Sequence, residues 1–190
     1  VFNAIHGSPG EDGEIQSYFK KLSIPITGCE AFQSMITYDK IKCLNYLKEF
    51  DIKSADSISL NINDKVDIDK IIKKVGLPCF VKASKSGSSY GISKVYKREE
   101  FENAIKTAFN EDTNILIESS LDGIEVSVGV INFQGKTICL PITEIVSHND
   151  FFDYNAKYMG KSSEITPARI SNKMKSIVTK ESLKIYKSPS

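Results

Sequence analysis

The chain has 190 residues, of which 41% are hydrophobic and 26% are charged, a composition typical of soluble globular proteins and not of disordered or fibrous ones. Its 25 Lys and Arg residues are balanced by 24 Asp and Glu residues, so it lacks the basic excess that draws proteins to nucleic acid. No apolar run approaches the roughly 20 residues that a membrane-spanning helix needs. We therefore expect no nucleic-acid partner and no membrane partner.

The first part of the chain predicts one strand and three helices. Residues 1–5 are mostly apolar and predict a strand, which leads into a turn rich in Gly, Pro and acidic residues at 6–13. Apolar residues at helical spacing predict helices at 15–22, 40–50 and 67–75. Asp39 is the expected N-cap of the second of these helices.

After Gly76 the pattern changes to short strands. Two apolar runs, 77–83 and 92–96, enclose a loop of Gly and Ser residues and predict a strand, a loop and a second strand. A further helix is predicted at 99–109 and further strands at 114–118, 126–133 and 136–146. Residues 149–166 have no clear period and predict a functional loop, and a helix-like pattern follows. This mixture predicts an α+β or α/β fold.

The loop at residues 86–91, the Gly/Ser loop, is the most informative local feature. Glycines let backbone N–H groups turn toward an anion, and serine hydroxyls add donors, so such a loop can fold over phosphates. Lys82 lies on the apolar strand just before the loop and needs either a negative partner or a route to solvent, because burial of an unpaired ammonium is costly. A simple hairpin turn is the alternative interpretation.

Three further features have both a functional and a structural interpretation. Glu118 lies at a predicted strand end, and Glu125 follows after a short connector. The two residues suit a nucleotide site in which a carboxylate holds the ribose hydroxyls. The alternative is that both are simply exposed. Residues 151–158 hold four aromatic rings and Lys157, which is typical either of a lid that closes over a reaction or of a surface loop. His6, taken by itself, is typical of a turn residue.

The cysteine and histidine content limits metal and redox chemistry. The four cysteines are far apart and form no CxxC pair, so neither a zinc site nor a redox motif is indicated. With two histidines in the chain, a His-rich metal centre is excluded, and we expect no metal-ligand set here. The cysteines are expected to be reduced, partly buried thiols of a cytosolic protein. The apolar start and the end directly after a helical pattern predict a fragment that lacks N-terminal and C-terminal parts.

The order of the motifs along the chain is more specific than any one of them. They are His6-Gly7, Gly10-Glu11-Asp12-Gly13, Thr27-Gly28, Asp39-Lys40, Val81-Lys82, Gly87-Ser88-Ser89, Glu118, Gly123 with Glu125, and Tyr154 with Ala156-Lys157-Tyr158. In this order they resemble the D-alanine–D-alanine ligase family of the ATP-grasp superfamily over essentially the whole chain. The resemblance implies an ATP-grasp fold of two α+β lobes, preceded by the end of a Rossmann-like N-terminal domain. It assigns residues 1–30 to that N-terminal substrate domain, 31–117 to the small lobe, and 118–190 to the start of the large lobe with its lid loop.

The resemblance also implies roles for individual residues. Lys40, Lys82 and Lys157 would hold the phosphates of ATP, and Ser88, Ser89 and Gly91 would form the loop over them. Glu118, Ser119 and Leu121 would contact adenine, and Glu125 would hold the ribose. Ser88, Tyr158 and His6 are the expected catalytic residues, at or beside the D-alanine site.

By the same resemblance, ATP phosphorylates the carboxylate of one D-alanine, and the amine of a second attacks the acylphosphate. Fixed positive charge and aimed N–H donors in a dry site suit both steps. Tyr158 favours the dipeptide product, because related ligases that make D-alanine–D-lactate usually lack this tyrosine. The expected setting is peptidoglycan precursor synthesis in a bacterial cytoplasm, with a homodimer as one expected state.

Two features of the family have no counterpart in the chain: the acidic residue of its N-terminal motif, and the C-terminal stretch whose Arg, Asp, Glu and Asn bind magnesium and stabilise the intermediate. Magnesium is therefore expected to be bound by a C-terminal part outside this chain, and the chain alone is expected to be incomplete for catalysis. The alternatives are another ATP-grasp carboxylate–amine ligase, a nucleotide-binding module without catalysis, or an interaction domain whose loop is only a turn.

Overall fold

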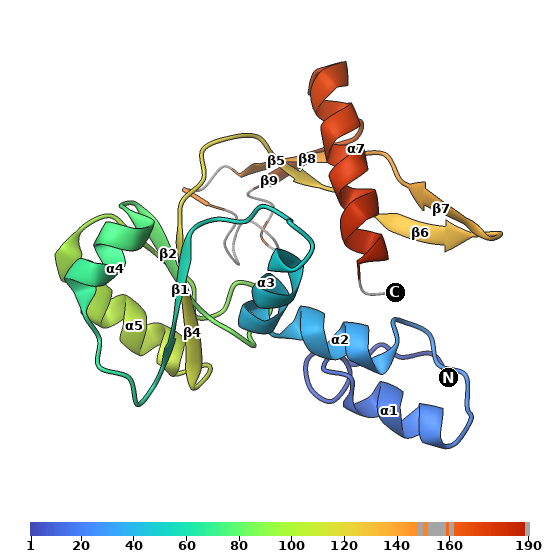
Figure 1. Ribbon diagram of the computed structural model, residues 1–190, viewed down its shortest axis with the longest axis horizontal. Coiled ribbons are helices and arrows are strands. Elements are labelled where there is room, and N and C mark those ends of the chain that lie inside the picture. The colour runs from blue at the N-terminus through green and yellow to red at the C-terminus, as the bar shows by residue number, and fades with distance from the viewer. Residues whose placement is uncertain (148–149, 152–158, 160–161, 189–190) are drawn as a thin grey trace. The chain divides into compact units, whose positions relative to one another are not determined.

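The structure is a computed structural model that describes residues 1–147, 150–151, 159 and 162–188. The chain divides into two compact units. The first comprises Val1–Glu49 and Lys53–Ser120, and the second comprises Phe50–Ile52 and Leu121–Ser190. In Figure 1 the first unit is coloured mainly from blue through green, and most of the second from yellow to red.

The first unit begins with three helices, α1 (Glu14–Lys21), α2 (Ala31–Tyr38) and α3 (Lys40–Lys48). Helices α1 and α3 confirm two predictions, whereas α2 has no counterpart among the predicted helices. The predicted strand at residues 1–5 is wrong. This segment instead bonds to a loop, since the Val1 ammonium donates to the Pro25 carbonyl and the Thr27 N–H donates to the Val1 carbonyl. Its apolar side chains are not buried against a sheet, and Phe2 is 81% exposed.

The centre of the first unit is a four-stranded antiparallel sheet with the strand order β1-β4-β2-β3. Its strands are β1 (Ser57–Asn61), β2 (Cys79–Ala83), β3 (Ser93–Val95) and β4 (Asn114–Ser119). Helices α4 (Ile68–Val75) and α5 (Phe101–Phe109), the latter preceded by the 3-10 turn η1 (Arg98–Glu100), lie together on one side of the sheet in Figure 1. The apolar core lies between them and the sheet and includes the fully buried Val81, Phe101, Ile115 and Ile117.

Several predictions of the sequence are confirmed in this unit. Strands β2 and β3 with the loop between them match the predicted strand, loop and strand, and β4 matches the strand at 114–118. Helices α4 and α5 match the helices at 67–75 and 99–109, and Asp67 is the N-cap of α4. Strand β1 has no counterpart among the predicted strands.

The sheet has a second face, opposite the core. Along β2, Cys79, Val81 and Ala83 are buried in the core, and because side chains alternate along a strand, Phe80 and Lys82 project from the other side. Glu118 on β4 is paired with Phe80 and projects from this second face as well. The second face therefore carries charged side chains where the first carries the core.

The second unit contains two small antiparallel sheets and a long helix. Strands β5 (Glu125–Ser127), β8 (Thr143–Ser147) and β9 (Ser162–Ile165) form one sheet in the order β5-β8-β9. Strands β6 (Val130–Phe133) and β7 (Lys136–Cys139) form the other, and helix α7 (Asn172–Lys187) packs against both of them. The Ser171 hydroxyl caps α7 by accepting a hydrogen bond from the Met174 N–H.

The predicted strands at 126–133 and 136–146 are wrong in extent, because each is divided between two sheets. Gly129 lies at the first break, where its carbonyl accepts a hydrogen bond from the Leu140 N–H at 2.8 Å. Pro141 lies at the second break and has no N–H with which to continue a ladder. Strand β9 also lies inside the stretch at 149–166 for which we predicted a loop.

Within the described residues, no helix combines the length and the apolar character that a membrane crossing requires. All four cysteines are free: Cys79 is buried, Cys29 is exposed, and Cys43 and Cys139 are half-buried. The expectation of unpaired, partly buried thiols is confirmed.

Candidate functional site

Asp39 places Lys40 at the N-terminus of α3. The Asp39 carboxylate accepts hydrogen bonds from the N–H groups of Ile41 at 3.1 Å and Lys42 at 3.2 Å, which confirms the predicted N-cap. Ser84, directly after β2, donates its hydroxyl to the same carboxylate oxygen at 2.6 Å, and the Lys40 N–H donates to the Ser84 carbonyl at 3.1 Å. Lys40 therefore begins a helix that is tied to the end of β2.

The Lys40 ammonium lies against the backbone at the root of the Gly/Ser loop. It donates hydrogen bonds to the carbonyls of Ala83 at 3.1 Å, Ser84 at 3.2 Å and Ser86 at 2.6 Å. Burial, and after it the nearby positive charge of Lys82, lowers the pKa of Lys40 to about 8. Lys40 is bonded to the carbonyl of Ala83, the residue after Lys82 on β2, and an anion bound by both lysines would offset the repulsion between their charges.

Of the two alternatives predicted for Lys82, a negative partner or a route to solvent, the structure shows the negative partner. On the second face of the sheet, its ammonium forms an ion pair with the carboxylate of Glu118. The two side chains are 18% and 20% exposed, so the pair is largely shielded from water. The alternative prediction, that Glu118 is simply an exposed residue at a strand end, is therefore wrong.

The Gly/Ser loop holds its serines in an uncommon backbone conformation. Ser88 and Ser89 have φ angles of 50° and 61°, and Gly91 has a φ angle of 65°. Glycine adopts this left-handed region readily, whereas other residues are strained there, and such strained residues cluster at ligand-binding and catalytic sites. A Cβ atom at Gly91 would also lie 2.6 Å from the side chain of Glu111, so this position requires glycine.

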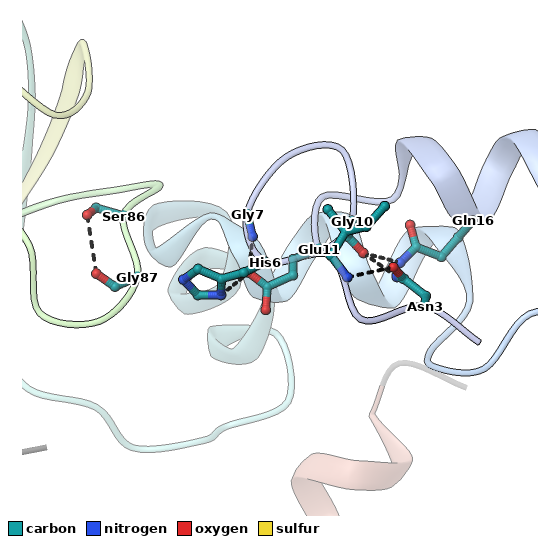
Figure 2. Close-up of polar contacts among 9 residues, drawn as sticks. Asn3, His6, Gly7, Gly10, Glu11, Gln16, Ser86 and Gly87 are labelled. Carbon is teal, nitrogen blue, oxygen red and sulfur yellow. Dashed lines mark hydrogen bonds and ion pairs between the residues drawn. The ribbon is translucent and has the colours of Figure 1, made fainter. Parts of the chain in front are cut away.

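His6 and Glu11 approach the same loop from the N-terminal turn. The Nδ1 atom of His6 lies 3.3 Å from the Glu11 carboxylate, which also accepts a hydrogen bond from the Gly7 N–H at 2.7 Å. Figure 2 shows the His6 ring extended toward the loop at Ser86 and Gly87. The ring comes within 3.4 Å of the point where a Cβ atom at Gly87 would lie, so it is close to the loop at this residue.

Two amide side chains fix this turn. Asn3 and Gln16 donate hydrogen bonds to the Gly10 carbonyl at 2.8 Å and 2.7 Å, as Figure 2 shows. A Cβ atom at Gly10 would lie 2.3 Å from the Ile5 carbonyl oxygen, so the backbone can pack this closely only with glycine. The turn is therefore a defined structure from which His6 projects.

The remaining predicted site residues lie at or after the end of β4. Ser119 is the last residue of β4 and is half-buried. Leu121 is 73% exposed, and Glu125 begins β5 with an exposed side chain. Lys157 and Tyr158 lie outside the described residues, so the structure says nothing of them.

Two side chains join this region that were not among the predicted site residues, Ser84 and Glu11. Ser84 directly follows the apolar run with Lys82, but its partner Asp39 is 45 residues away. Glu11 lies in the predicted turn with His6 and in the motif Gly10-Glu11-Asp12-Gly13, but the sequence predicted no contact between the two side chains. Asp39 was predicted as a helix cap, and its bond to Ser84 depends on the tertiary fold.

Among the described residues, no group of three or more His, Cys, Asp and Glu side chains is placed to hold a metal ion. These residues therefore do not fit a magnesium site. Their contribution to an anionic ligand is the positive charge of Lys40 and Lys82 and the donors of the Gly/Ser loop.

The fold is similar to solved ligase structures. VanG D-Ala:D-Ser ligase from Enterococcus faecalis matches 99% of this chain over 55% of its own, with a TM-score of 0.85 and 31% sequence identity. D-alanine–D-alanine ligase from Bacillus anthracis matches 98% of this chain over 60% of its own, with a TM-score of 0.81 and 35% identity. Together with the lysine pair and the loop, this likeness places the chain in the class of ATP-grasp ligases.

Sequence comparison is more specific. Residues 46–189 match the family model described as D-ala D-ala ligase C-terminus, and the chain belongs to that family. It is 55% identical to the D-alanine–D-alanine ligase of Flavobacterium johnsoniae over 98% of this chain and 58% of that protein. The corresponding ligase of Bacteroides fragilis is 43% identical over 92% of this chain and 54% of its own length. The predicted family and fold are confirmed, and the chain spans little more than half the length of these relatives.

Proposed function

We propose that the full-length protein joins two D-alanine molecules into D-alanyl-D-alanine with ATP, for peptidoglycan precursor synthesis in the bacterial cytoplasm. In the first step a carboxylate oxygen of one D-alanine attacks the γ-phosphorus of ATP, which gives an acylphosphate and ADP. In the second step the amine of the other D-alanine attacks the acyl carbon, so that a C–N bond forms, phosphate leaves and the amine loses a proton. The contacts of the Lys40 ammonium with Ala83, which follows Lys82, and with Ser86 at the root of the Gly/Ser loop carry this proposal.

Lys40 and Lys82 hold the phosphates of ATP. The Lys40 ammonium donates to the carbonyl of Ala83, the residue after Lys82, and the charge of Lys82 contributes to the lowered pKa of Lys40. Three carbonyls hold Lys40, and Glu118 holds Lys82, so both charges are in place before a ligand arrives. Positive charge that is already positioned stabilises a transferring phosphoryl group more than charge that must move into place.

Ser88, Ser89 and Gly91 form the lid of the phosphate site. The support for this role is their left-handed backbone conformation, which is strained for serine. Such a conformation can turn successive backbone N–H groups toward one anion. The loop begins at Ser86, whose carbonyl accepts from the Lys40 ammonium, so its root adjoins the lysine pair. Lys157 is assigned to the same phosphate site because its motif, Ala156-Lys157-Tyr158, resembles that of the family.

Ser88, His6 and Tyr158 serve the D-alanine site. The His6 ring lies beside Gly87, which precedes Ser88 in the loop, and this places an imidazole next to the proposed phosphate lid. Because Glu11 lies at the Nδ1 side of the ring, the Nε2 side is left for the loop or a substrate. Tyr158 is assigned to this site because its motif resembles that of the family, and the presence of a tyrosine there favours an amine as the second substrate.

The adenine and ribose are assigned to the segment that leaves β4. Glu118 is paired with Lys82 near the end of β4, and Ser119 and Leu121 follow it along the chain, so we assign these three residues to the base. Glu125 is exposed and free of the core, as a ribose ligand must be. The proposal retains 1–30, 31–117 and 118–190 as the substrate domain, the small lobe and the start of the large lobe.

Phosphate release by the full-length protein tests the proposal. We expect release from ATP that requires D-alanine, with D-alanyl-D-alanine detected by mass spectrometry. Release that follows another carboxylate and ignores D-alanine would identify a different ATP-grasp carboxylate–amine ligase. Binding of ATP without any release would identify a nucleotide-binding module without catalysis.

A further inference from the structure

Asp39 and Ser84 form a buried hydrogen bond between the N-cap of α3 and the end of β2. Asp39 is 7% exposed and Ser84 is fully buried, and the Ser84 hydroxyl lies 2.6 Å from the carboxylate oxygen. Burial by itself raises the pKa of the Asp39 carboxyl, but hydrogen bonds from Ser84 and from the Lys42 N–H outweigh it, and the pKa lies below its ordinary value. The carboxylate is therefore ionised and accepts these bonds at neutral pH.

Ser84 connects three elements at one residue. Its N–H donates to the Asn114 carbonyl on β4 at 2.9 Å, and its carbonyl accepts from the Lys40 N–H at 3.1 Å. Its hydroxyl oxygen also lies 3.3 Å from the Ile41 N–H, which donates to it. Because Ser84 directly follows β2, these bonds fix the start of α3 to the strand that carries Lys82.

A second capped helix in the same unit shows what capping alone requires. Asp67 caps α4 by accepting a hydrogen bond from the Lys70 N–H at 3.0 Å. Asp67 is exposed, and the bond lies within its own helix. Capping thus needs neither a buried carboxylate nor a bond to a distant strand, and Asp39 has both.

We infer that Asp39 and Ser84 are positioning residues that hold the Lys40 ammonium at the root of the Gly/Ser loop, beside Lys82, where both bind the same nucleotide phosphates. The inference rests on the proposed function, because both residues act through Lys40. Without their hydrogen bond, the first turn of α3 loses its tie to the end of β2. Lys40 then leaves the carbonyls of Ala83 and Ser86, and the two charges no longer converge.

Steady-state kinetics of the full-length protein test the inference, with Ser84→Ala and Asp39→Ala compared with the capping control Asp67→Ala. We expect the first two to raise the KM for ATP roughly tenfold, as expected for loss of a buried charge-assisted hydrogen bond, with a smaller effect on kcat. Asp67→Ala also removes a cap and should lower the melting temperature, but the KM for ATP should not change. Asp39→Asn keeps an acceptor and a good cap, so it should restore most of the affinity.

A chemical measurement on the protein without substrate covers the case in which Asp39→Ala does not fold. Lys40 is acylated with an amine reagent, and the modified peptide is quantified by mass spectrometry against the exposed Lys21. We expect Ser84→Ala to change the labelling of Lys40 but not of Lys21, because release from its carbonyls changes both the exposure and the pKa of the Lys40 amine.

Two results would overturn the inference: a KM shift in Ser84→Ala no larger than that of Asp67→Ala, or unchanged labelling of Lys40. The lysines separate this failure from failure of the proposed function. If Lys40→Ala and Lys82→Ala leave the KM for ATP unchanged, the proposed function itself is wrong. If they raise it and Ser84→Ala does not, only the positioning role is wrong.

Discussion

Lys82 and Glu118 form a diagonal ion pair across the neighbouring antiparallel strands β2 and β4. In the register, Lys82 is opposite Leu116 and Glu118 is opposite Phe80. The two charged side chains are therefore diagonal neighbours on the same face of the sheet, two residues away from direct pairing. Both project from the second face of the sheet, away from the core. The pair places an ammonium group on a rigid strand and compensates its charge when no nucleotide is present.

Removal of one partner should be costlier than removal of both. Lys82→Met leaves the shielded Glu118 carboxylate without its partner, and we expect the free energy of unfolding to fall by about 1 to 3 kcal/mol. Adding Glu118→Gln should recover part of that loss. Chemical denaturation of both single variants and the double variant measures the coupling, and strictly additive effects would show that the pair contributes nothing to stability.

Lys40 should make nucleotide binding sensitive to mildly alkaline pH. Burial and the charge of Lys82 lower its pKa to about 8. Because only the protonated lysine attracts phosphate, the affinity for a nonhydrolysable ATP analogue should fall by up to about tenfold per pH unit above that pKa. Lys40→Arg keeps its charge throughout this range and should show a flat profile. A wild-type profile as flat as that of the arginine variant would contradict the assignment.

Elements whose boundaries depend on nearby residues were predictable from the sequence. Asp39 and Asp67 cap helices whose apolar residues follow at helical spacing, and both caps are made within three residues. Strand β1 was not predicted, although Ser57–Asn61 alternates polar and apolar residues as a half-buried strand does. Its pairing with β4 is what the local sequence does not show. Residues 1–5 have the composition of a strand, but this fold gives them a loop as partner.

The candidate site could be predicted in part. A lysine inside an apolar strand needs a negative partner or a route to solvent, and this was evident from Lys82 alone. That the partner is Glu118 depends on the register of β2 against β4, which local sequence does not encode. The Asp39–Ser84 bond is likewise a product of the tertiary fold. The roles of Lys157 and Tyr158 stay predictions.

Glu144 and Arg169 should make the second unit sensitive to acid. Two side-chain nitrogens of Arg169 donate hydrogen bonds to the Glu144 carboxylate at 2.9 Å and 2.7 Å. The backbone N–H of Arg169 donates to the same carboxylate at 3.0 Å. These hydrogen bonds lower the pKa of Glu144 to about 2. Since this is below the value of about 4.3 in an unfolded chain, the stabilisation is complete above that value and is lost as the pH falls toward the folded pKa.

We therefore expect Glu144→Gln to lower the melting temperature at neutral pH, and its difference from wild type to shrink below about pH 4. Glu164→Gln, on the neighbouring strand β9 and exposed, is the matched control and should have little effect. Melting curves across acidic pH measure both. A difference that stays constant from neutral pH to pH 3 would contradict the role of the ion pair.

Gly91 should be required for both the shape and the ligand of the Gly/Ser loop. Gly91 and Gly135 both have positive φ angles, 65° and 75°, so alanine at either costs about 1 kcal/mol. At Gly91 the added Cβ also meets Glu111, whereas at Gly135 nothing lies within 4 Å. We expect both variants to melt earlier, and only Gly91→Ala to lose affinity for an ATP analogue. Equal nucleotide binding by the two variants would exclude the loop from the phosphate site.

Binding calorimetry on the full-length protein, with magnesium and either a nonhydrolysable ATP analogue or AMP, measures the convergence of the two lysines on one set of phosphates. Lys40→Ala and Lys82→Ala should each weaken binding of the triphosphate at least tenfold, since each removes a charge-assisted contact, while AMP binds nearly as in wild type. Triphosphate affinity that is unchanged in both variants, or that falls no more than AMP affinity, would contradict the account.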